Sequence, residues 1–144
     1  MNKFKEIRPI VVGIVKKDNK ILGMPGLKKE TNQKYVRLIG GGVEFLEPLE
    51  VALKREFKEE LNVDIKVNEY LGFEDSIIVY DGKDAHEHVF LYEIDVLADL
   101  KNEYNYEEIT DEGEKLHQNV CWFDIEDIKS GKILIFPTIA KNFI

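Results

Sequence analysis

The sequence predicts an α+β fold with several short strands and one long helix. Runs of β-branched and aromatic residues between turn residues indicate strands on both sides of residues 48–61, and residues 48–61 show uninterrupted helical spacing of apolar residues. The chain has 144 residues, of which 44% are hydrophobic and 33% are charged. A chain of this size and composition can form one core under a charged surface. We therefore expect residues 1–144 to form a single domain.

The net charge narrows the class of ligand. A formal charge of -8 and a pI near 5.0 disfavour the electrostatic attraction on which most nucleic-acid-binding surfaces depend. A small phosphorylated ligand remains possible if a divalent cation lies between the ligand and the protein's carboxylates, because the ion then dominates the local charge. The composition therefore favours a small phosphorylated partner over a nucleic acid.

Cysteine content and the apolar runs indicate the compartment. The single cysteine, Cys121, cannot form an intramolecular disulfide. Charged residues interrupt the apolar runs of residues 1–20, so no signal peptide is predicted, and no stretch approaches the roughly 20 apolar residues of a membrane span. We expect a cytoplasmic protein without a membrane partner.

The region before the helix predicts strands and turns. Residues 10–15 are apolar and largely β-branched, and a polar turn candidate at residues 17–20 precedes another apolar pair, which predicts a hairpin. Residues 35–39 predict a further strand, and the three glycines at residues 40–42 are expected to end it.

The region after the helix predicts a long hairpin. Residues 63–67 and 71–80 predict strands, Asp81 and Gly82 supply a turn, and residues 86–96 predict the returning strand. The acidic segment 99–119 gives no pattern from which an element can be predicted. Further on, residues 120–123 predict a last strand and residues 125–130 predict a short helix.

The helix over residues 48–61 has clear ends. Pro48 suits the first turn, and Asn62 stands where a left-handed cap residue is expected. Its apolar residues share one arc of the helix and are Leu49, Ala52, Leu53, Phe57 and Leu61.

Two glutamates, Glu56 and Glu60, fall inside this apolar arc, and Glu59 borders it. Carboxylates directed towards a core are costly if they stay dry, unpaired and ionised. A hard cation such as Mg²⁺ or Mn²⁺ would compensate them, since it prefers oxygen ligands. The alternative is an acidic helix whose charges pair on a solvated face. We favour that alternative for Glu50 but not for Glu56 and Glu60.

A longer motif surrounds these glutamates. Gly41, five residues, Glu47, seven residues and then the segment Arg55-Glu56-Phe57-Lys58-Glu59-Glu60-Leu61-Asn62-Val63 resembles the Nudix box, a loop-helix-loop signature of pyrophosphohydrolases. The flanking strands, the long hairpin and the segment 122–124 extend the resemblance over most of the chain. The resemblance implies an α/β/α sandwich around a mixed sheet, with the box helix 48–61 packed on the sheet. Ile39, Leu46 and Asn62 depart from the box, where proline, glycine and glycine are common.

The resemblance also implies roles for individual residues. The metal ligands would be the Gly40 carbonyl oxygen and the carboxylates of Glu56, Glu59 and Glu60, and the cofactor would be Mg²⁺, with Mn²⁺ possible. Gly41, Glu47 and Asn62 would be structural, and Arg55 would orient carboxylates such as Glu47 or Glu59.

The resemblance implies a reaction in which a metal-activated water attacks a diphosphate phosphorus. A general base would be Glu60 itself or a carboxylate from elsewhere in the chain. Glu114 and Glu87 are the candidates outside the helix, and we prefer Glu114.

Three further residues are candidates for contact with the substrate. His86 and His88 flank Glu87 at strand spacing, so the two imidazoles are expected on one face and Glu87 on the other. Such histidines are commonly plain surface residues, and coordination of a hard cation by them is disfavoured. Tyr80 could stack on a base, although packing is the more common role of a strand tyrosine.

The substrate stays open among three alternatives. The leading one is a nucleoside diphosphate linked to another group, as in a nucleotide sugar or a dinucleoside polyphosphate. The second is a nucleoside triphosphate, and the third is a non-catalytic nucleotide-sensing module with the same fold. Ile78 and Val79 occupy the stretch where a proline would have pointed to ADP-ribose. A homodimer is a further possibility, because homodimers are common among small proteins.

Overall fold

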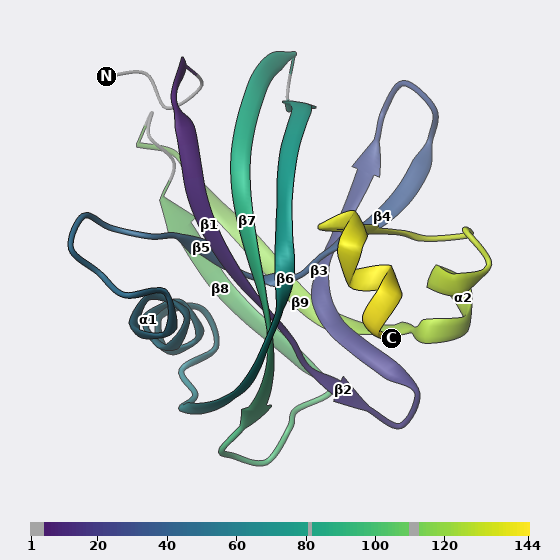
Figure 1. Cartoon of the computed structure of the whole chain (residues 1–144). Helices are drawn as coiled ribbons and strands as arrows, with labels where there is room; N and C mark the ends of the chain where they lie inside the picture. The colour runs from purple at the N-terminus through teal and green to yellow at the C-terminus, as the bar shows by residue number, and fades with distance from the viewer. Residues whose placement is uncertain (1–4, 81, 110–112) are drawn as a thin grey trace.

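The computed structural model describes residues 5–80, 82–109 and 113–144 (Figure 1). Its helices are α1 (Leu49–Leu61), α2 (Ile125–Lys129) and the 3₁₀ helix η2 (Thr138–Phe143). Its strands are β1 (Ile7–Ile14), β2 (Lys16–Lys17), β3 (Lys20–Lys28), β4 (Gln33–Arg37), β5 (Ile39–Gly42), β6 (Ile65–Tyr80), β7 (Lys83–Val96), β8 (Glu103–Ile109), β9 (Lys115–Asp124) and β10 (Leu134–Phe136).

The strands form two mixed sheets. One sheet has the order β5-β1-β7-β6, in which β1 is parallel to β7 and antiparallel to β5. The other has the order β10-β4-β3-β9-β8, in which β10 is parallel to β4, and β2 pairs with β3 beside this path. The long hairpin β6–β7 follows α1, as the sequence predicts.

The side chains of β1 and of Val15, which follows it, are divided between two hydrophobic cores. Val11 and Val15 belong to the core that contains the buried face of α1. Ile10, Val12 and Ile14 belong to the core that contains buried residues of α2 and η2. The strands therefore lie between helices on opposite sides, with α1 on one side and α2 and η2 on the other (Figure 1). This arrangement confirms the predicted α/β/α sandwich.

Helix α1 begins one residue later than predicted, because Pro48 is its N-cap with an extended backbone. At the other end, Asn62 has φ 55° and ψ 42°, and its backbone N–H donates to the Lys58 carbonyl oxygen at 3.0 Å. This is the left-handed cap that the sequence predicts. The buried face consists of Ala52, Leu53, Phe57 and Leu61.

The glycine run does not end a strand, contrary to the prediction. Residues Ile39–Gly42 form β5, which pairs with β1. Gly40 has φ +155°, and a Cβ atom at this position would lie 1.9 Å from the carbonyl oxygen of Val11. Glycine thus allows a close approach of backbones here, rather than a turn.

Three further predictions need correction. The separate strands 63–67 and 71–80 are one strand, β6, whose register shifts between Val67 and Glu69 and between Tyr70 and Gly72. The unassigned segment 99–119 contains β8 and the start of β9, and β8 gives no amphipathic signal because most of its residues are exposed. The strand at residues 120–123 is not the last, since β10 follows α2.

Of the two predicted turns, at residues 17–20 and 81–82, the first can be compared with the structure in full. The turn at residues 17–20 is confirmed by the pairing of β2 with β3, whereas β1 itself pairs with β5 and β7. Asp81 lies outside the described residues. Among the described residues, no helix is long and apolar enough to cross a membrane.

Candidate active site

A cleft of about 380 Å³ lies where α1 and β5 face the strands of both sheets. The three glycines of residues 40–42 and the carboxylates of Glu56 and Glu60 line it from the box. Its other polar lining residues are Arg8, Arg37, His86, Glu87, Tyr106, Glu108 and Gln118. The cleft therefore brings the predicted glutamates together with polar residues from five further strands, β1, β4, β7, β8 and β9.

Gly41 places the β5 backbone against the carboxylate of Glu56. A Cβ atom at Gly41 would lie 2.5 Å from Cδ of Glu56 and 2.6 Å from each of its oxygens. Any side chain at this position would collide with the carboxylate. The sequence of the box thus leaves room for Glu56 to enter the cleft.

Arg55 connects the carboxylates of the box through its guanidinium group. Its Nε and Nη2 atoms donate to the two oxygens of Glu47 at 2.7 and 2.9 Å. Its Nη1 atom donates to Glu56 at 3.0 Å and to Glu59 at 3.3 Å, and Nη2 also donates to the carbonyl oxygen of Gly42 at 2.9 Å. The planar fork thus links the loop, β5 and α1 at one point.

The pKa values of the box carboxyls diverge because their surroundings differ. Hydrogen bonds from Arg55 and from the Glu44 backbone N–H lower the pKa of Glu47 to about 2. Burial raises the pKa of Glu56, against the opposing effect of Arg55, and burial together with the charge of Glu56 raises the pKa of Glu60. Glu47 is therefore a fixed anion, whereas Glu56 and Glu60 form a hydrogen-bonded pair.

Glu60 also has an unsatisfied oxygen. Its Oε2 atom is buried and has no hydrogen-bond partner among the described residues. A buried polar atom without a partner is costly, and a cation or a water is the usual remedy. The two predicted ligands at the cleft thus have an oxygen that a cation could satisfy.

The remaining predicted ligands occupy different places. Gly40 lines the cleft beside Glu56 and Glu60. Glu59 is exposed and is not among the residues that line the cleft, but it shares the Nη1 donor of Arg55 with Glu56.

The wall opposite α1 carries two arginines and a buried glutamate. Glu87 is 6% exposed, and its Oε2 atom lies 3.9 Å from Nη1 of Arg8 and 3.7 Å from Nη2 of Arg37. Both guanidinium groups line the cleft, so this acidic protein has positive charge directly beside its carboxylate pair. Such a wall can hold the oxygens of a phosphate.

The strand β8 contributes Tyr106 and Glu108, which lie on the same face at alternating positions. The hydroxyl of Tyr106 donates to Sδ of Met24 at 3.1 Å, and burial raises its pKa. Glu108 accepts a hydrogen bond from Nε2 of Gln118 at 3.1 Å.

Glu114, the general base preferred from the sequence, is exposed and is not among the residues that line the cleft.

The two histidines lie on one face of β7, and buried Glu87 lies on the other, as the strand spacing predicts. Both imidazoles approach Asp75 on β6, and His86 also lines the cleft. Tyr80 ends β6, but its side chain lies outside the described part of the chain.

Four residues of the cleft are not predicted from the sequence: Arg8, Arg37, Tyr106 and Glu108. They come from β1, β4 and β8, and only the sheet pairing brings them together. No local spacing announces such residues. The alternation of Tyr106 and Glu108 in an otherwise acidic segment is the one signal that could have placed a pair of them on a common face.

Comparison with known proteins agrees with this geometry. A family model described as the NUDIX domain matches residues 7–142. A solution structure of the E. coli ORF135 protein matches with 23% identity over 92% of this chain and 83% of that chain, with a TM-score of 0.59. A crystal structure of a MutT NUDIX hydrolase from Burkholderia pseudomallei matches with 25% identity over 84% of this chain and 85% of that chain, with a TM-score of 0.55. A search of curated proteins found no match.

The family match includes the box, the cleft and both sheets. Proteins of this family act on small nucleotide-like substrates and generally use a divalent metal. The chain belongs to the NUDIX domain family and is a hydrolase that acts on pyrophosphate bonds.

Proposed function

We propose that the protein is a Mg²⁺-dependent pyrophosphohydrolase that cleaves a nucleoside diphosphate linked to another group. The observation that carries this proposal is the pair of Glu56 and Glu60, in which Glu60 has a buried oxygen without a partner, in a cleft that Arg8 and Arg37 also line. An acidic pair and a basic wall in one cleft suit a substrate that binds through a cation and through direct phosphate contacts.

The residues fit a hard cation. The available donors at the pair are carboxylate oxygens and the backbone of Gly40, which are ligands that Mg²⁺ prefers over softer metals. The buried Oε2 atom of Glu60 would gain the partner that it lacks. Glu56 and Glu60 would hold the ion, and Glu59 would join through the network of Arg55. When bound, Mg²⁺ lowers the pKa of water and neutralises charge on the phosphate oxygens.

The other residues of the cleft supply positioning and proton transfer. Arg8 and Arg37 would donate hydrogen bonds to the non-bridging oxygens of the diphosphate and compensate its charge. Arg55 is a positioning residue, because its contacts are to Glu47, Glu56 and Glu59 rather than to the space of the cleft.

Glu108 is our preferred proton acceptor, since it lines the cleft together with Glu56 and Glu60, whereas Glu114 does not line it. Glu87 also lines the cleft, but its Oε2 atom lies 3.9 Å from Arg8 and 3.7 Å from Arg37. We therefore assign Glu87 to the orientation of Arg8 and Arg37.

A second hollow supports a substrate with a group beyond the diphosphate. It has a volume of about 770 Å³ and shares Tyr35, Arg37 and Ile78 with the first cleft. Lys28 and Lys29 line it together with apolar side chains of β6 and β10. A diphosphate beside α1 could thus extend a further phosphorylated or apolar group past Arg37.

The test is a hydrolysis screen with Mg²⁺ across nucleotide sugars, ADP-ribose, dinucleoside polyphosphates and nucleoside triphosphates. We expect the highest kcat/KM for a diphosphate with a second group, and we expect no turnover in EDTA. Exclusive hydrolysis of nucleoside triphosphates to monophosphate and pyrophosphate would favour the second alternative. Nucleotide binding without hydrolysis of any compound would overturn the proposal in favour of a sensing module.

A further inference from the structure

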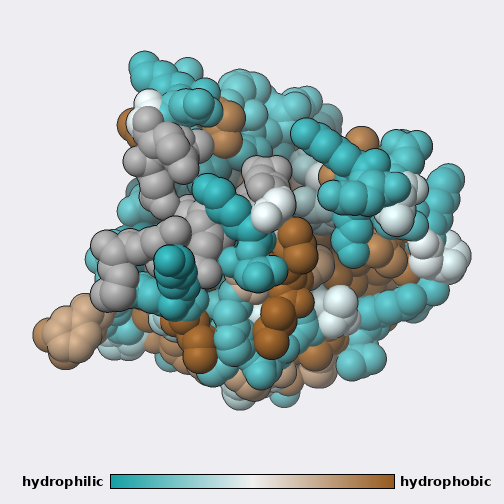
Figure 2. All heavy atoms as spheres, turned by 90° about the horizontal axis from the view of Figure 1, so that it is seen from above, coloured by the Kyte–Doolittle hydropathy of each residue, from teal (hydrophilic) through white to brown (hydrophobic). Residues whose placement is uncertain are grey.

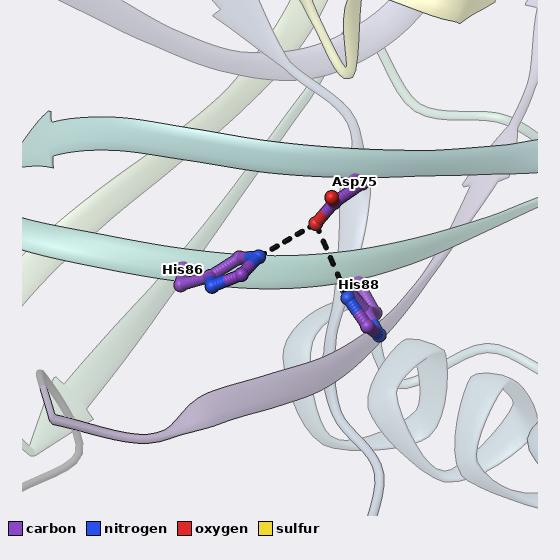
Figure 3. A group of neighbouring side chains, drawn as sticks. All are labelled: Asp75, His86 and His88. Atoms are coloured by element: carbon purple, nitrogen blue, oxygen red, sulfur yellow. Dashed lines mark hydrogen bonds and ion pairs between the residues drawn. The ribbon is translucent and has the colours of Figure 1, made fainter.

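A second cluster of possible metal ligands lies on the hairpin β6–β7. Figure 3 shows that Asp75 on β6 and His86 and His88 on β7 direct their polar ends to one point. The Nε2 atoms of His86 and His88 lie 2.6 and 3.2 Å from the same oxygen, Oδ1 of Asp75. The three possible ligand atoms all lie within 4.8 Å of one another.

The strands themselves produce this convergence. Asp75 is the direct cross-strand partner of His88, and His86 lies two residues earlier on the same face of β7. The ring of His88 also packs edge-on against Phe73, with ring centroids 5.1 Å apart. The ligands are therefore held by paired backbones and by an aromatic neighbour, rather than by a loop.

Two imidazole nitrogens can approach one carboxylate oxygen in two ways: each ring donates an N–H group to the oxygen, or a metal ion lies between the three groups. Tetrahedral ligands about 2.1 Å from such an ion lie about 3.4 Å from one another. The distances of 2.6 and 3.2 Å from Oδ1 of Asp75 and the 4.8 Å limit on all three separations bracket this value, so side-chain shifts can bring the three atoms to the spacing that an ion needs.

The chemistry of the donors selects the metal. Two imidazoles and one carboxylate suit Zn²⁺ and neighbouring transition metals, whereas Mg²⁺ prefers oxygen alone. The exposed fractions of the side chains are 57% for Asp75, 33% for His86 and 38% for His88, so an ion could enter and keep a water. We propose that Asp75, His86 and His88 form a transition-metal site of the Zn²⁺ class, separate from the oxygen-donor site of the box.

This site would border the cleft, because its ligand His86 also lines the cleft. Glu87 stands between the two histidines in the sequence, and its side chain lies on the opposite face of β7, where it contacts Arg8 and Arg37. A metal that ties β6 to β7 at this point would hold the segment that carries Glu87. The proposal does not rest on the function proposed above, because it needs only the ligands on the hairpin.

Zinc binding to the untagged protein tests the proposal. Zn²⁺ is titrated calorimetrically in excess Mg²⁺, which occupies sites made of oxygen ligands, and Co²⁺ is titrated with its visible absorption as the readout. We expect one Zn²⁺ per chain, a rise in Tm, and Co²⁺ bands typical of nitrogen and oxygen ligands. The variants His88→Gln and Asp75→Asn should weaken Zn²⁺ binding by at least about tenfold.

His117→Gln is the matched control, because His117 is the third histidine of the chain and lies on β9 next to Asn105. It should bind Zn²⁺ as the wild type does. Unchanged Zn²⁺ affinity in both hairpin variants would overturn the proposal, and so would loss of Zn²⁺ binding in Glu60→Gln instead. Hydrolysis is measured in parallel with Mg²⁺ alone, so a failure of the proposed function leaves the zinc result readable.

Discussion

The two walls of the cleft are built in different ways. The helix wall consists of Gly41, Glu56 and Glu60, and Arg55 fixes it through hydrogen bonds within residues 42–59. The strand wall draws on β1, β4, β7 and β8, and its ion pairs from Glu87 to Arg8 and Arg37 span 3.7 to 3.9 Å. One wall is a short-range network with close contacts, and the other is assembled by sheet pairing with looser ones.

This difference separates two tasks. A wall that is fixed by a bidentate arginine can hold a cation in one geometry, because the carboxylates cannot rotate freely. A wall with longer contacts can adjust to the group that a substrate carries beyond its diphosphate. The surface above it, towards the hairpin tips, is mainly hydrophilic with separate hydrophobic groups (Figure 2). We therefore expect changes in the helix wall to affect turnover most.

The largest effect is expected for Glu60→Gln. Loss of one ligand and of its charge should lower turnover of the best substrate by at least about a hundredfold. The measurement is kcat with saturating Mg²⁺, and full activity of this variant would remove the helix wall from the metal site.

Mg²⁺ should reverse which of the two proteins, wild type or Glu60→Gln, is the more stable. In EDTA, Glu60→Gln should be at least as stable as the wild type, because burial and Glu56 raise the pKa of Glu60 and so disfavour its ionised form in the fold. At a Mg²⁺ concentration of 100 times Kd, the wild type should gain about 2.7 kcal/mol, and the variant should gain less. Equal stabilisation of both proteins by Mg²⁺ in thermal unfolding would contradict the assignment.

The strand wall is tested by Glu108→Gln beside Glu114→Gln. If Glu108 accepts the proton, its variant should lose about a hundredfold in kcat, the lower end of general-base effects, and metal affinity should hardly change. Glu114→Gln should stay close to the wild type. If instead Glu114→Gln lowers kcat and alters the pH-rate profile while Glu108→Gln does not, Glu114 is the general base. If neither variant lowers kcat, the general base is a carboxylate of the box.

Arg55→Ala should lower kcat by about 10-fold to 100-fold with the fold intact, since the carboxylates would lose their common donor. Arg55→Lys should retain only part of the wild-type kcat, because an ammonium group cannot form the bidentate contact with Glu47. Lys54→Ala, next to it on the exposed side of α1, is the control and should have normal turnover. Equal kcat values for Arg55→Ala and Lys54→Ala would exclude a positioning role.

The contrast between the walls also decides what the sequence could predict. The spacing of Glu56 and Glu60 and the cap at Asn62 depend on one helix, so local periodicity places them correctly. Arg8 and Arg37 meet Glu87 only through the pairing of β1 with β7 and the stacking of two sheets, which no local pattern encodes. Strand β8 was not predicted for a different reason, because its mostly exposed residues give no apolar period.

The smallest effect is expected where the box loop departs from its common pattern. Leu46 has φ +65° and is 86% exposed, so its side chain contributes little burial while its backbone adopts a conformation that costs an L-residue roughly 1–2 kcal/mol. Leu46→Gly removes that cost but adds roughly 0.5–1 kcal/mol of chain entropy to the unfolded state, so we expect a net gain in stability of up to about 1.5 kcal/mol. Asn62→Gly is the matched control, because Asn62 has φ +55° and asparagine tolerates this region. The free energy of unfolding of this variant should change by less than about 1 kcal/mol, and its activity should stay within a few fold of the wild type. Denaturant unfolding of both variants decides the matter. A clear loss of stability in Leu46→Gly would contradict this expectation, because it would mean that the leucine side chain makes stabilising contacts in the folded protein.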